Sequence, residues 1–254
     1  MTVSVIIPTL NEADNLDRLI GNLAREPCEI VIVDGGSKDD TVPVAEARGV
    51  HCIMSPPGRG LQLHAGAAVA AGDALLFLHA DCRFPKGGIR RIASILETRP
   101  EAVGGNHRLI FDGADKFSRW LNGFYAWIRS HGVYYGDSGI FVRRSAFDAI
   151  GGIRPIALME DFDLVRRMES FGETVCLGEP PLMTSSRRFA GRHPVAIVYG
   201  WLKIHALYYL GISPARLARI YDSERRRGHS PETACMKSVK ETNSGPPAEK
   251  GGIG

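Results

Sequence analysis

The chain has 254 residues, of which 44% are hydrophobic and 23% charged. These values exclude a disordered or fibrous protein and allow one sizeable core. The formal net charge of +3 gives no reason to expect a nucleic-acid partner, which would need a concentrated basic face. The five cysteines form no CxxC pair and the N-terminus lacks a signal-peptide pattern, so we expect a cytoplasmic protein.

The first hundred residues alternate short β-branched runs with helical patterns, which is typical of βαβ units around a mainly parallel sheet. We expect strands over residues 3–7, 29–33, 51–54 and 74–78. Asn11 can cap the first helix, whose apolar stripe comprises Leu16, Leu19, Ile20 and Leu23. Ser37 and Asp40 have the spacing of a capping box for a helix ending near Arg48, and a third helix is expected over 61–71.

The second half of the chain has a looser rhythm. It predicts strands over 103–111 and 139–143, a short strand pair around Val175 and Leu182, and helices over 114–129, from Asp161 onward and toward the C-terminus. The apolar stretch from Val195 to Ile212 contains Lys203 and His205, which favours a surface or interfacial helix over a spanning one. Residues 228–254 are rich in Pro, Gly, Ser, Lys and Glu and are expected to be disordered.

Polar residues follow three of the predicted strands. They are Pro8-Thr9-Leu10-Asn11-Glu12, Asp34-Gly35-Gly36-Ser37 and His79-Ala80-Asp81. In open α/β sheets ligands bind beyond the carboxyl ends of the strands, so these groups are candidates for a site. Asp34 is equally well explained as a ligand for a ribose or base and as a helix-capping residue in a tight turn.

Two further sets of charged residues have a structural alternative beside the functional one. His79 and Asp81 could face one divalent cation or a ribose, although His and Asp are also ordinary turn residues. Glu160 and Asp161 begin a helix, where the helix dipole favours carboxylates, and one of them could instead deprotonate an attacking hydroxyl. The arginines could bind phosphate or form solvated surface patches; they are Arg59, Arg187 and Arg188.

The motifs taken together resemble family 2 glycosyltransferases of GT-A fold. The shared order is Ile6-Ile7-Pro8-Thr9-Leu10-Asn11-Glu12, then Val31-Ile32-Val33-Asp34-Gly35-Gly36-Ser37 with Asp39 or Asp40 and Thr41, an acidic turn after a buried strand, and Glu160-Asp161. This resemblance covers about residues 3–185. A narrower similarity, to small bacterial transferases associated with radical-SAM and selenium-domain proteins, involves residues 58–62, 78–81, 136–144 and 186–188 and extends to about Tyr221.

The resemblance implies an α/β fold with a Rossmann-like, mainly parallel sheet flanked by helices and followed by C-terminal helices. It implies one domain over residues 1–227, with a nucleotide-binding half (1–100) and an acceptor half (101–227). The activity implied is transfer of a sugar from a nucleotide diphosphate donor to an acceptor hydroxyl, with Mn²⁺ or Mg²⁺ and with inversion. A UDP-sugar is the first expectation for the donor and a GDP-sugar the second, and a lipid-linked acceptor at the inner face of the membrane is one candidate.

The resemblance also implies a role for each site residue. Asp161, with Glu160 beside it, is expected to be the general base, and Asp81 the metal ligand, with His79 as a second metal ligand or a ribose contact. The residues expected at the nucleotide are Pro8, Thr9, Asn11, Glu12, Asp34, Gly36, Ser37, Arg59, Gln62 and His79. The residues expected at the acceptor or the phosphates are Asp137, Arg187 and Arg188.

Three positions depart from the family pattern. His79 stands where the metal motif usually has its first Asp, Cys82 replaces a small polar residue, and His64 stands where the narrower branch is expected to have Asn. Two other function classes are compatible with an α/β layout: a nucleotide-sugar-binding protein without turnover, and a nucleotidyltransferase. The latter normally needs a Gly-rich phosphate loop after the first strand, which Pro8-Thr9-Leu10-Asn11-Glu12 does not provide.

A membrane contact is a separate expectation. Aromatic and basic residues near the C-terminus suit an interfacial helix, although packing against the core explains them as economically. These residues are Trp201, Leu202, Lys203, Leu207, Tyr208, Tyr209, Leu210, Arg216 and Arg219.

Overall fold

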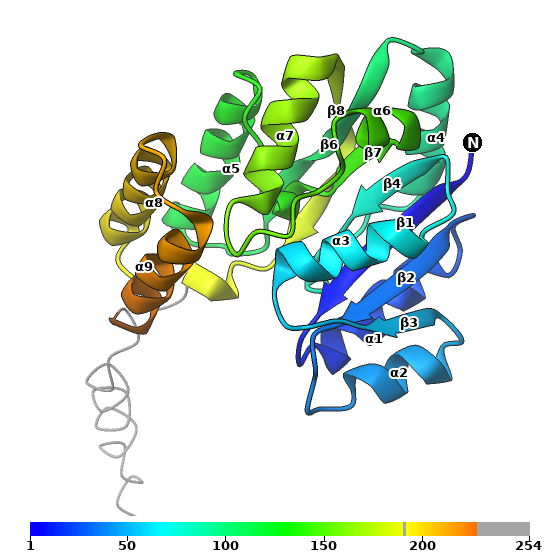
Figure 1. The fold of residues 1–254 in the computed structure, drawn as a ribbon, viewed down its shortest axis with the longest axis horizontal. Helices are drawn as coiled ribbons and strands as arrows, with labels where there is room; N and C mark the ends of the chain where they lie inside the picture. The colour runs from blue at the N-terminus through cyan, green and yellow to red at the C-terminus, as the bar shows by residue number, and fades with distance from the viewer. Residues whose placement is uncertain (190–191, 228–254) are drawn as a thin grey trace, which may run out of the picture. The chain divides into compact units, whose positions relative to one another are not determined.

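The computed structural model describes residues 1–189 and 192–227, and it forms two compact units (Figure 1). The first unit comprises Met1–Arg188, and the second begins at Phe189. The predicted tail over 228–254 lies outside the described residues. A single domain over residues 1–227 stays a prediction.

An eight-stranded sheet forms the centre of the first unit. Its strands are β1 (Val3–Thr9), β2 (Glu29–Asp34), β3 (His51–Met54), β4 (Ala74–Phe77), β5 (Cys82–Arg83), β6 (Ala102–Phe111), β7 (Ile140–Arg143) and β8 (Glu173–Thr184). Their order is β3-β2-β1-β4-β7-β6-β8-β5. Only β7 and β5 run antiparallel to their neighbours, so the predicted mainly parallel sheet is confirmed.

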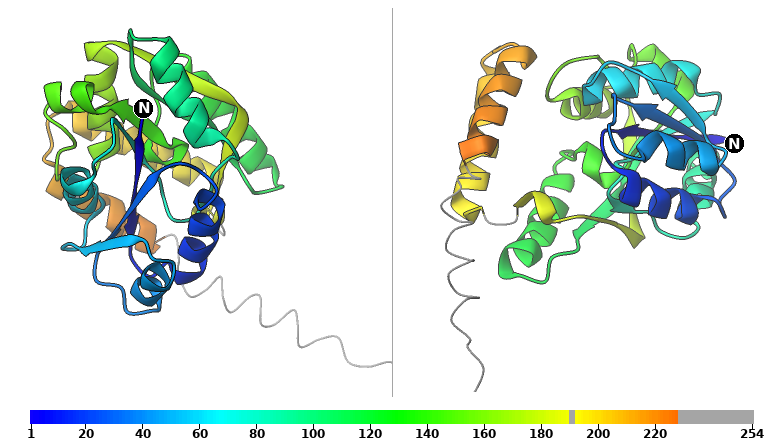
Figure 2. Two further views of the ribbon diagram at one scale, coloured as in Figure 1. Left: turned by 90° about the vertical axis from the view of Figure 1, so that its right-hand side faces the viewer. Right: turned by 90° about the horizontal axis from the view of Figure 1, so that it is seen from below.

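Helices cover both faces of this sheet. They are α1 (Ala13–Leu23), α2 (Thr41–Ala47), α3 (Arg59–Val69), α4 (Gly88–Thr98), α5 (Lys116–Arg129), α6 (Arg144–Ala149) and α7 (Glu160–Phe171). Seen from below, α3 and α1 lie on opposite faces of the strands (Figure 2). The four apolar residues predicted for the stripe of α1 are all buried, and β4 is buried along its whole length, as a strand covered on both faces should be.

Helix α3 approaches β1 and β2 closely because residue 66 is a glycine. A Cβ atom at Gly66 would lie 2.5 Å from Cγ2 of Ile6 and 2.8 Å from Cγ2 of Val33. Those separations are shorter than any van der Waals contact, so a larger residue would force the helix away from the sheet. The first turn of α3 is thereby held at the end of β1 and β2, where the candidate site lies.

Two predicted helix caps are wrong. The residue before α1 is Glu12, and Asn11 has a left-handed backbone (φ 55°) with its side-chain oxygen accepting a hydrogen bond from the Lys38 amide. The proposed capping box is absent: the Ser37 hydroxyl accepts a hydrogen bond from the Asn11 amide and donates one to Asp34, and α2 begins after Asp40. Both side chains therefore connect loops at the sheet edge instead of capping the N-terminus of a helix.

The strand pair expected around Val175 and Leu182 is one long strand, β8. It pairs with β6 on both sides of an irregularity, with Leu177 opposite His107 and Leu182 opposite Leu109. Residues 178–181 therefore face a single residue of β6. A bulge of this kind interrupts the alternation of side chains, which explains why the sequence suggests two strands.

The second unit contains helices α8 (Pro194–Tyr209) and α9 (Pro214–Arg227), which pack against each other. In its described part the buried apolar residues are Phe189, Ile197, Ile204 and Leu217. The exposed large apolar side chains of that part are Val195, Tyr199, Leu202, Tyr209 and Leu210. Within residues 1–189 and 192–227, every helix is too short or too polar to cross a membrane.

Candidate active site

Three strands bring their polar ends to the same edge of the sheet. β1 lies between β2 and β4 and is parallel to both, with Thr9 opposite Asp34 and Ile6 opposite Phe77. The turn that carries His79 and Asp81 follows β4 directly. The structure therefore brings the three predicted polar clusters to one edge, as expected for parallel strands.

Asp34 organises the turn that follows β2. Its carboxylate is fully buried and accepts hydrogen bonds from the amides of Gly36 (2.8 Å) and Ser37 (2.7 Å) and from the Thr9 hydroxyl (3.2 Å). Gly36 adopts φ 91°, which the turn requires. The expected tight turn is therefore present, but Asp34 does not cap a helix, because α2 begins after Asp40. A contact of Asp34 with a nucleoside stays a prediction.

Gln62 fastens helix α3 to the ends of two strands. Its side-chain nitrogen donates to the carbonyl oxygens of Thr9 and Val33, both at 2.8 Å, and only 4% of the residue is exposed. The Thr9 carbonyl oxygen also accepts a hydrogen bond from the Gly35 amide (2.9 Å), so Gln62 adds a second donor at the end of β1. Pro8 lies within β1, opposite Val33.

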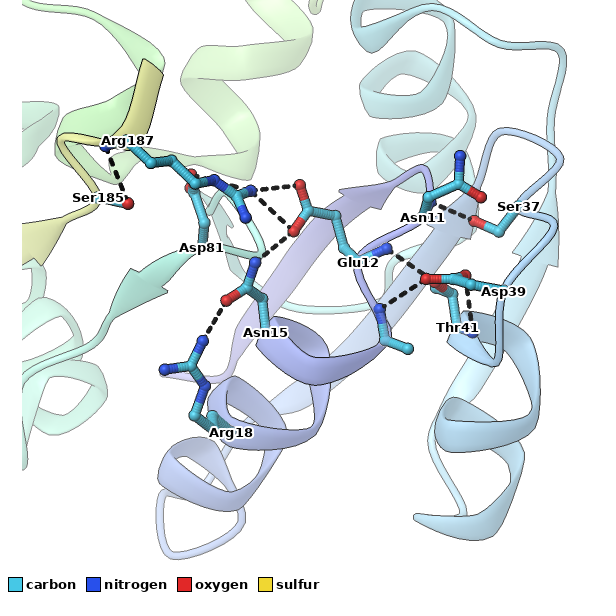
Figure 3. A network of polar contacts seen from close by, with 11 residues as sticks. Asn11, Glu12, Asn15, Arg18, Ser37, Asp39, Thr41, Asp81, Ser185 and Arg187 are labelled. Carbon is cyan, nitrogen blue, oxygen red and sulfur yellow. Dashed lines mark hydrogen bonds and ion pairs between the residues drawn. The ribbon is translucent and has the colours of Figure 1, made fainter. Parts of the chain in front are cut away.

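A network of charged residues surrounds Glu12 (Figure 3). The Asn11 amide donates to the Ser37 hydroxyl (2.8 Å), and the Glu12 amide donates to the Thr41 hydroxyl (2.9 Å). One nitrogen of the Arg187 guanidinium lies 2.7 and 3.0 Å from the two carboxylate oxygens of Glu12. The same nitrogen is 3.5 Å from the Asp81 carboxylate. Arg187 thus joins two predicted site acids, while the Arg188 side chain lies outside the described part.

The second acidic cluster lies at the start of α7. Arg59 donates to Glu160 and lies 3.7 Å from the Asp161 carboxylate. Asp161 also accepts hydrogen bonds from the amides of Gly136 (2.9 Å) and Phe162 (2.8 Å). Glu160 is 1% exposed and Asp161 8%, so the two carboxylates depend on these donors for compensation.

Two backbone features bring Arg59 to this cluster. A Cβ atom at Gly60 would lie 2.4 Å from the Ile156 carbonyl oxygen, so only glycine lets α3 begin against the segment that precedes α7. Met159 has a left-handed conformation (φ 69°) immediately before Glu160. Such a conformation is unfavourable for a side chain with a Cβ, and it is often found at functional turns.

The environment gives the two neighbouring carboxyl groups different acidities. Burial would raise the pKa of Asp161, but the Arg59 charge and the amides of Gly136 and Phe162 outweigh it and hold the pKa below the usual range. Burial dominates at Glu160 and raises its pKa despite the contact with Arg59. Asp161 is therefore a carboxylate at neutral pH, as a general base must be.

His79 and Asp81 lie in different pockets. His79 lines a narrow pocket with Arg59, Gly136 and Asp161. Asp81 lines a pocket of about 610 Å³ with polar residues that include Asp112, Thr184, Ser185 and Arg187. Asp34 lines neither pocket. The first turn of α3 contacts Asp161 through Arg59 and the ends of β1 and β2 through Gln62. The turn at residues 79–81 carries His79 in the first pocket and Asp81 in the second.

The acids at this edge fit a metal ion that arrives with a substrate. In residues 1–189 and 192–227, no three His, Cys, Asp or Glu side chains converge as a complete metal site. Mg²⁺ usually binds one or two protein carboxylates and completes its shell with water and substrate phosphates. Asp81, with a quarter of its side chain exposed in a polar pocket, could supply such a single carboxylate.

Two further residues singled out in the sequence have buried or partly buried polar contacts. Asp137 is 4% exposed and accepts a hydrogen bond from the Tyr125 hydroxyl at 3.4 Å. His64, noted as a departure, has its Nδ1 3.0 Å from the Ile153 carbonyl oxygen. Sequence reasoning missed Tyr125 and the partnership of Asn15 with Glu12. The three-residue spacing of Asn15 and Glu12 on a helix was a usable signal, whereas Tyr125 had none.

Comparisons with known proteins agree with this architecture. A family model described as glycosyl transferase family 2 matches residues 4–154. An uncharacterized glycosyltransferase of Mycobacterium tuberculosis is 31% identical over 109 residues, which are 42% of this chain and 49% of the relative. An undecaprenyl-phosphate 4-deoxy-4-formamido-L-arabinose transferase of Yersinia enterocolitica is 31% identical over 157 residues, 56% of this chain and 47% of the relative. The chain thus spans about half the length of these curated relatives.

A solved structure extends the likeness in fold over most of the chain. It is a mannosyltransferase of Pyrobaculum calidifontis in complex with GDP-mannose and Mn²⁺, with a TM-score of 0.60 and 14% identity. The match covers 94% of this chain and 79% of the mannosyltransferase. At this identity it supports the fold alone, and it agrees with the expected GT-A architecture.

Proposed function

This chain belongs to glycosyltransferase family 2, and on that premise we propose that it transfers a sugar from a nucleotide diphosphate donor to an acceptor hydroxyl. One observation carries the proposal: a buried carboxylate, Asp161, is kept ionised beside a sheet edge that also presents Asp81. A base and a carboxylate for a metal ion are the two groups that direct displacement at an anomeric carbon requires of the protein.

The proposed reaction has a simple balance of bonds. The acceptor hydroxyl attacks the anomeric carbon as the bond from that carbon to the diphosphate oxygen breaks. Asp161 accepts the hydroxyl proton, and the electron pair of the broken bond leaves with the nucleoside diphosphate. Attack from the side opposite the leaving group inverts the anomeric centre. Mn²⁺ or Mg²⁺ held by Asp81 would neutralise the charge that builds on the diphosphate.

The other site residues support these two groups. Arg59 keeps Asp161 ionised, and the amides of Gly136 and Phe162 fix the orientation of its carboxylate. Thr9, Glu12 and Asp34 are proposed to lie at the nucleoside. Within this proposal Asp34 acts chiefly by shaping the turn, because both of its oxygens already accept hydrogen bonds.

The substrates to test follow from the family resemblance and from two similar proteins. The resemblance implies a UDP-sugar, the mannosyltransferase structure contains GDP-mannose, and the Yersinia relative is named for undecaprenyl phosphate. We therefore propose UDP- and GDP-sugars as donors and a lipid-linked acceptor as one candidate. Exposed apolar residues of α8 would suit contact with the inner face of a membrane. Flotation with anionic liposomes tests that contact, and failure to co-migrate would exclude it.

The proposed function is tested by a thermal-shift panel of UDP, GDP and other nucleoside diphosphates with and without Mn²⁺. We expect one nucleotide to raise the melting temperature more with Mn²⁺ than without it. The corresponding sugar nucleotide should then be turned over with release of nucleoside diphosphate. Release of pyrophosphate would indicate a nucleotidyltransferase, and binding without turnover across an acceptor panel would indicate a binding protein.

A further inference from the structure

We infer that Arg187 serves as the counter-cation of Asp81, in place of the metal ion, until a nucleotide diphosphate binds. Metal and nucleotide would then bind together, because the nucleotide draws Arg187 away from Asp81. The inference rests on the proposed function, since it concerns how the same site takes up its metal ion.

The contacts of Arg187 carry the first step. A single guanidinium nitrogen lies within 3.0 Å of both Glu12 oxygens and 3.5 Å from the Asp81 carboxylate (Figure 3). Only 23% of the Glu12 side chain and 25% of the Asp81 side chain are exposed. The same positive charge therefore lies beside two partly buried acids, of which one is the candidate metal ligand.

A divalent cation at Asp81 would meet the Arg187 charge at short range. The ion would have to bind beside a like charge or displace the guanidinium from Asp81, and either event weakens its affinity. The Arg187 side chain is 55% exposed, so packing does not lock it in its observed position. The Arg187–Asp81 contact therefore opposes binding of a metal ion at Asp81, while the exposed guanidinium can still move to another partner.

A diphosphate offers the guanidinium a better partner. Arginine binds phosphate oxygens through paired, charge-assisted hydrogen bonds. Arg187 follows closely on Thr184 and Ser185, which line the same polar pocket as Asp81. A diphosphate bound there can take over the guanidinium while its oxygens complete the shell of the incoming ion. Arg187 would thus weaken binding of the metal ion alone and strengthen binding of the metal ion together with the nucleotide.

These opposite effects define the experiment. Mn²⁺ is titrated into the full chain, and the free ion is measured by electron paramagnetic resonance, alone and with saturating UDP or GDP. Relative to wild type, Arg187→Ala should bind Mn²⁺ alone about two- to fivefold more tightly, the range expected on removing an exposed ion-pair partner. The same variant should bind the nucleotide with Mn²⁺ about tenfold more weakly, because a charged hydrogen bond is lost.

Arg48→Ala is the matched control. Arg48 lines the same pocket and carries the same charge, but it pairs with Asp17 at 2.7 Å. The variant should therefore bind Mn²⁺ as the wild type does in both conditions. A general loss of positive charge would instead affect both variants alike and would overturn the inference.

The remaining outcomes separate the two proposals. If nucleotide strengthens Mn²⁺ binding by the wild type but Arg187→Ala binds Mn²⁺ alone no more tightly, the counter-cation role is wrong and the proposed function stands. The counter-cation role is equally wrong if neither protein binds Mn²⁺ alone. If nucleotide does not affect Mn²⁺ binding by the wild type, the proposed metal–nucleotide site is itself wrong.

Discussion

Replacing Arg59 with alanine would leave two buried carboxylates without their main counter-charge. Glu160 is 1% exposed and Asp161 8%, and both contact the Arg59 guanidinium. Removing one partner of a fully buried ion pair typically costs about 3–5 kcal/mol. The Arg59 side chain is 38% exposed, so solvent screens part of the interaction and we expect about 2–3 kcal/mol at neutral pH. For a unit of this size that loss lowers the melting temperature by about 4–12 °C.

The loss should shrink as the pH falls. In the wild type the pKa of Asp161 is held below its usual range, so its contribution to stability is present at neutral pH and disappears as the pH falls through that lowered pKa. In Arg59→Ala both carboxyl groups should have raised pKa values. The folded variant then takes up protons before the unfolded chain does, which restores stability between about pH 7 and pH 4.

Arg154→Ala is the control for this measurement. Arg154 lies 3.0 Å from Asp163 but is 59% exposed, and Asp163 keeps a second partner in Arg167 at 2.6 Å. Its removal should cost less than about 1 kcal/mol, with little dependence on pH. Urea denaturation of both variants at about pH 7.5 and about pH 5, values chosen as roughly either side of the expected titration, would decide the matter. An Arg59→Ala loss equal at both pH values, or no larger than that of Arg154→Ala, would refute the reasoning.

Four further predictions concern the site and the core. Asp161→Asn should keep nucleotide binding by thermal shift and lower the rate of nucleoside diphosphate release by about 10²–10⁴-fold; normal transfer would show that another group is the base. Asp81→Ala should abolish the Mn²⁺-dependent part of the nucleotide thermal shift, and an unchanged shift would exclude Asp81 as a metal ligand. The pH–rate profile should lose activity only below the ordinary carboxyl range, because the pKa of Asp161 is lowered; an acid limb near neutrality would contradict this. Gly66→Ala should cost about 1–3 kcal/mol in urea denaturation, since its Cβ would lie 2.5 Å from Ile6 and 2.8 Å from Val33; wild-type stability would mean that the helix moves freely.

Strands β1 to β4 could be predicted closely because side-chain alternation and β-branched runs report directly on local backbone preference, whereas β5 was not predicted and β8 was expected as two strands. β3 spans the predicted residues His51–Met54, and the predicted stripe of α1 is buried. The caps could not be predicted in the same way. Ser37 can bond to the start of a helix or to the Asp34 carboxylate, and this choice depends on a loop conformation that spacing does not encode.

The site shows the same division between local and long-range information. Parallel strands end at one edge, so Thr9, Asp34 and the turn after β4 could be expected together. The pairing of Arg59 with Glu160 joins residues 101 positions apart and depends on Gly60 and on the left-handed Met159. The spacing of the sequence gives no sign of these contacts with the acids of α7, and a contact of Arg59 with the nucleotide stays a prediction.

Because Arg59 and Gln62 share the first turn of α3, a small displacement of this helix would change the contacts at two separate points. Gln62 ties the turn to the carbonyls of Thr9 and Val33, and Arg59 ties it to Glu160 and Asp161. Loosening the helix would weaken the contacts at the ends of β1 and β2 and raise the pKa of Asp161 in the same movement. Under the proposed mechanism, donor recognition and proton abstraction would thus be linked through about one helical turn, and variants that disturb one should be tested for the other.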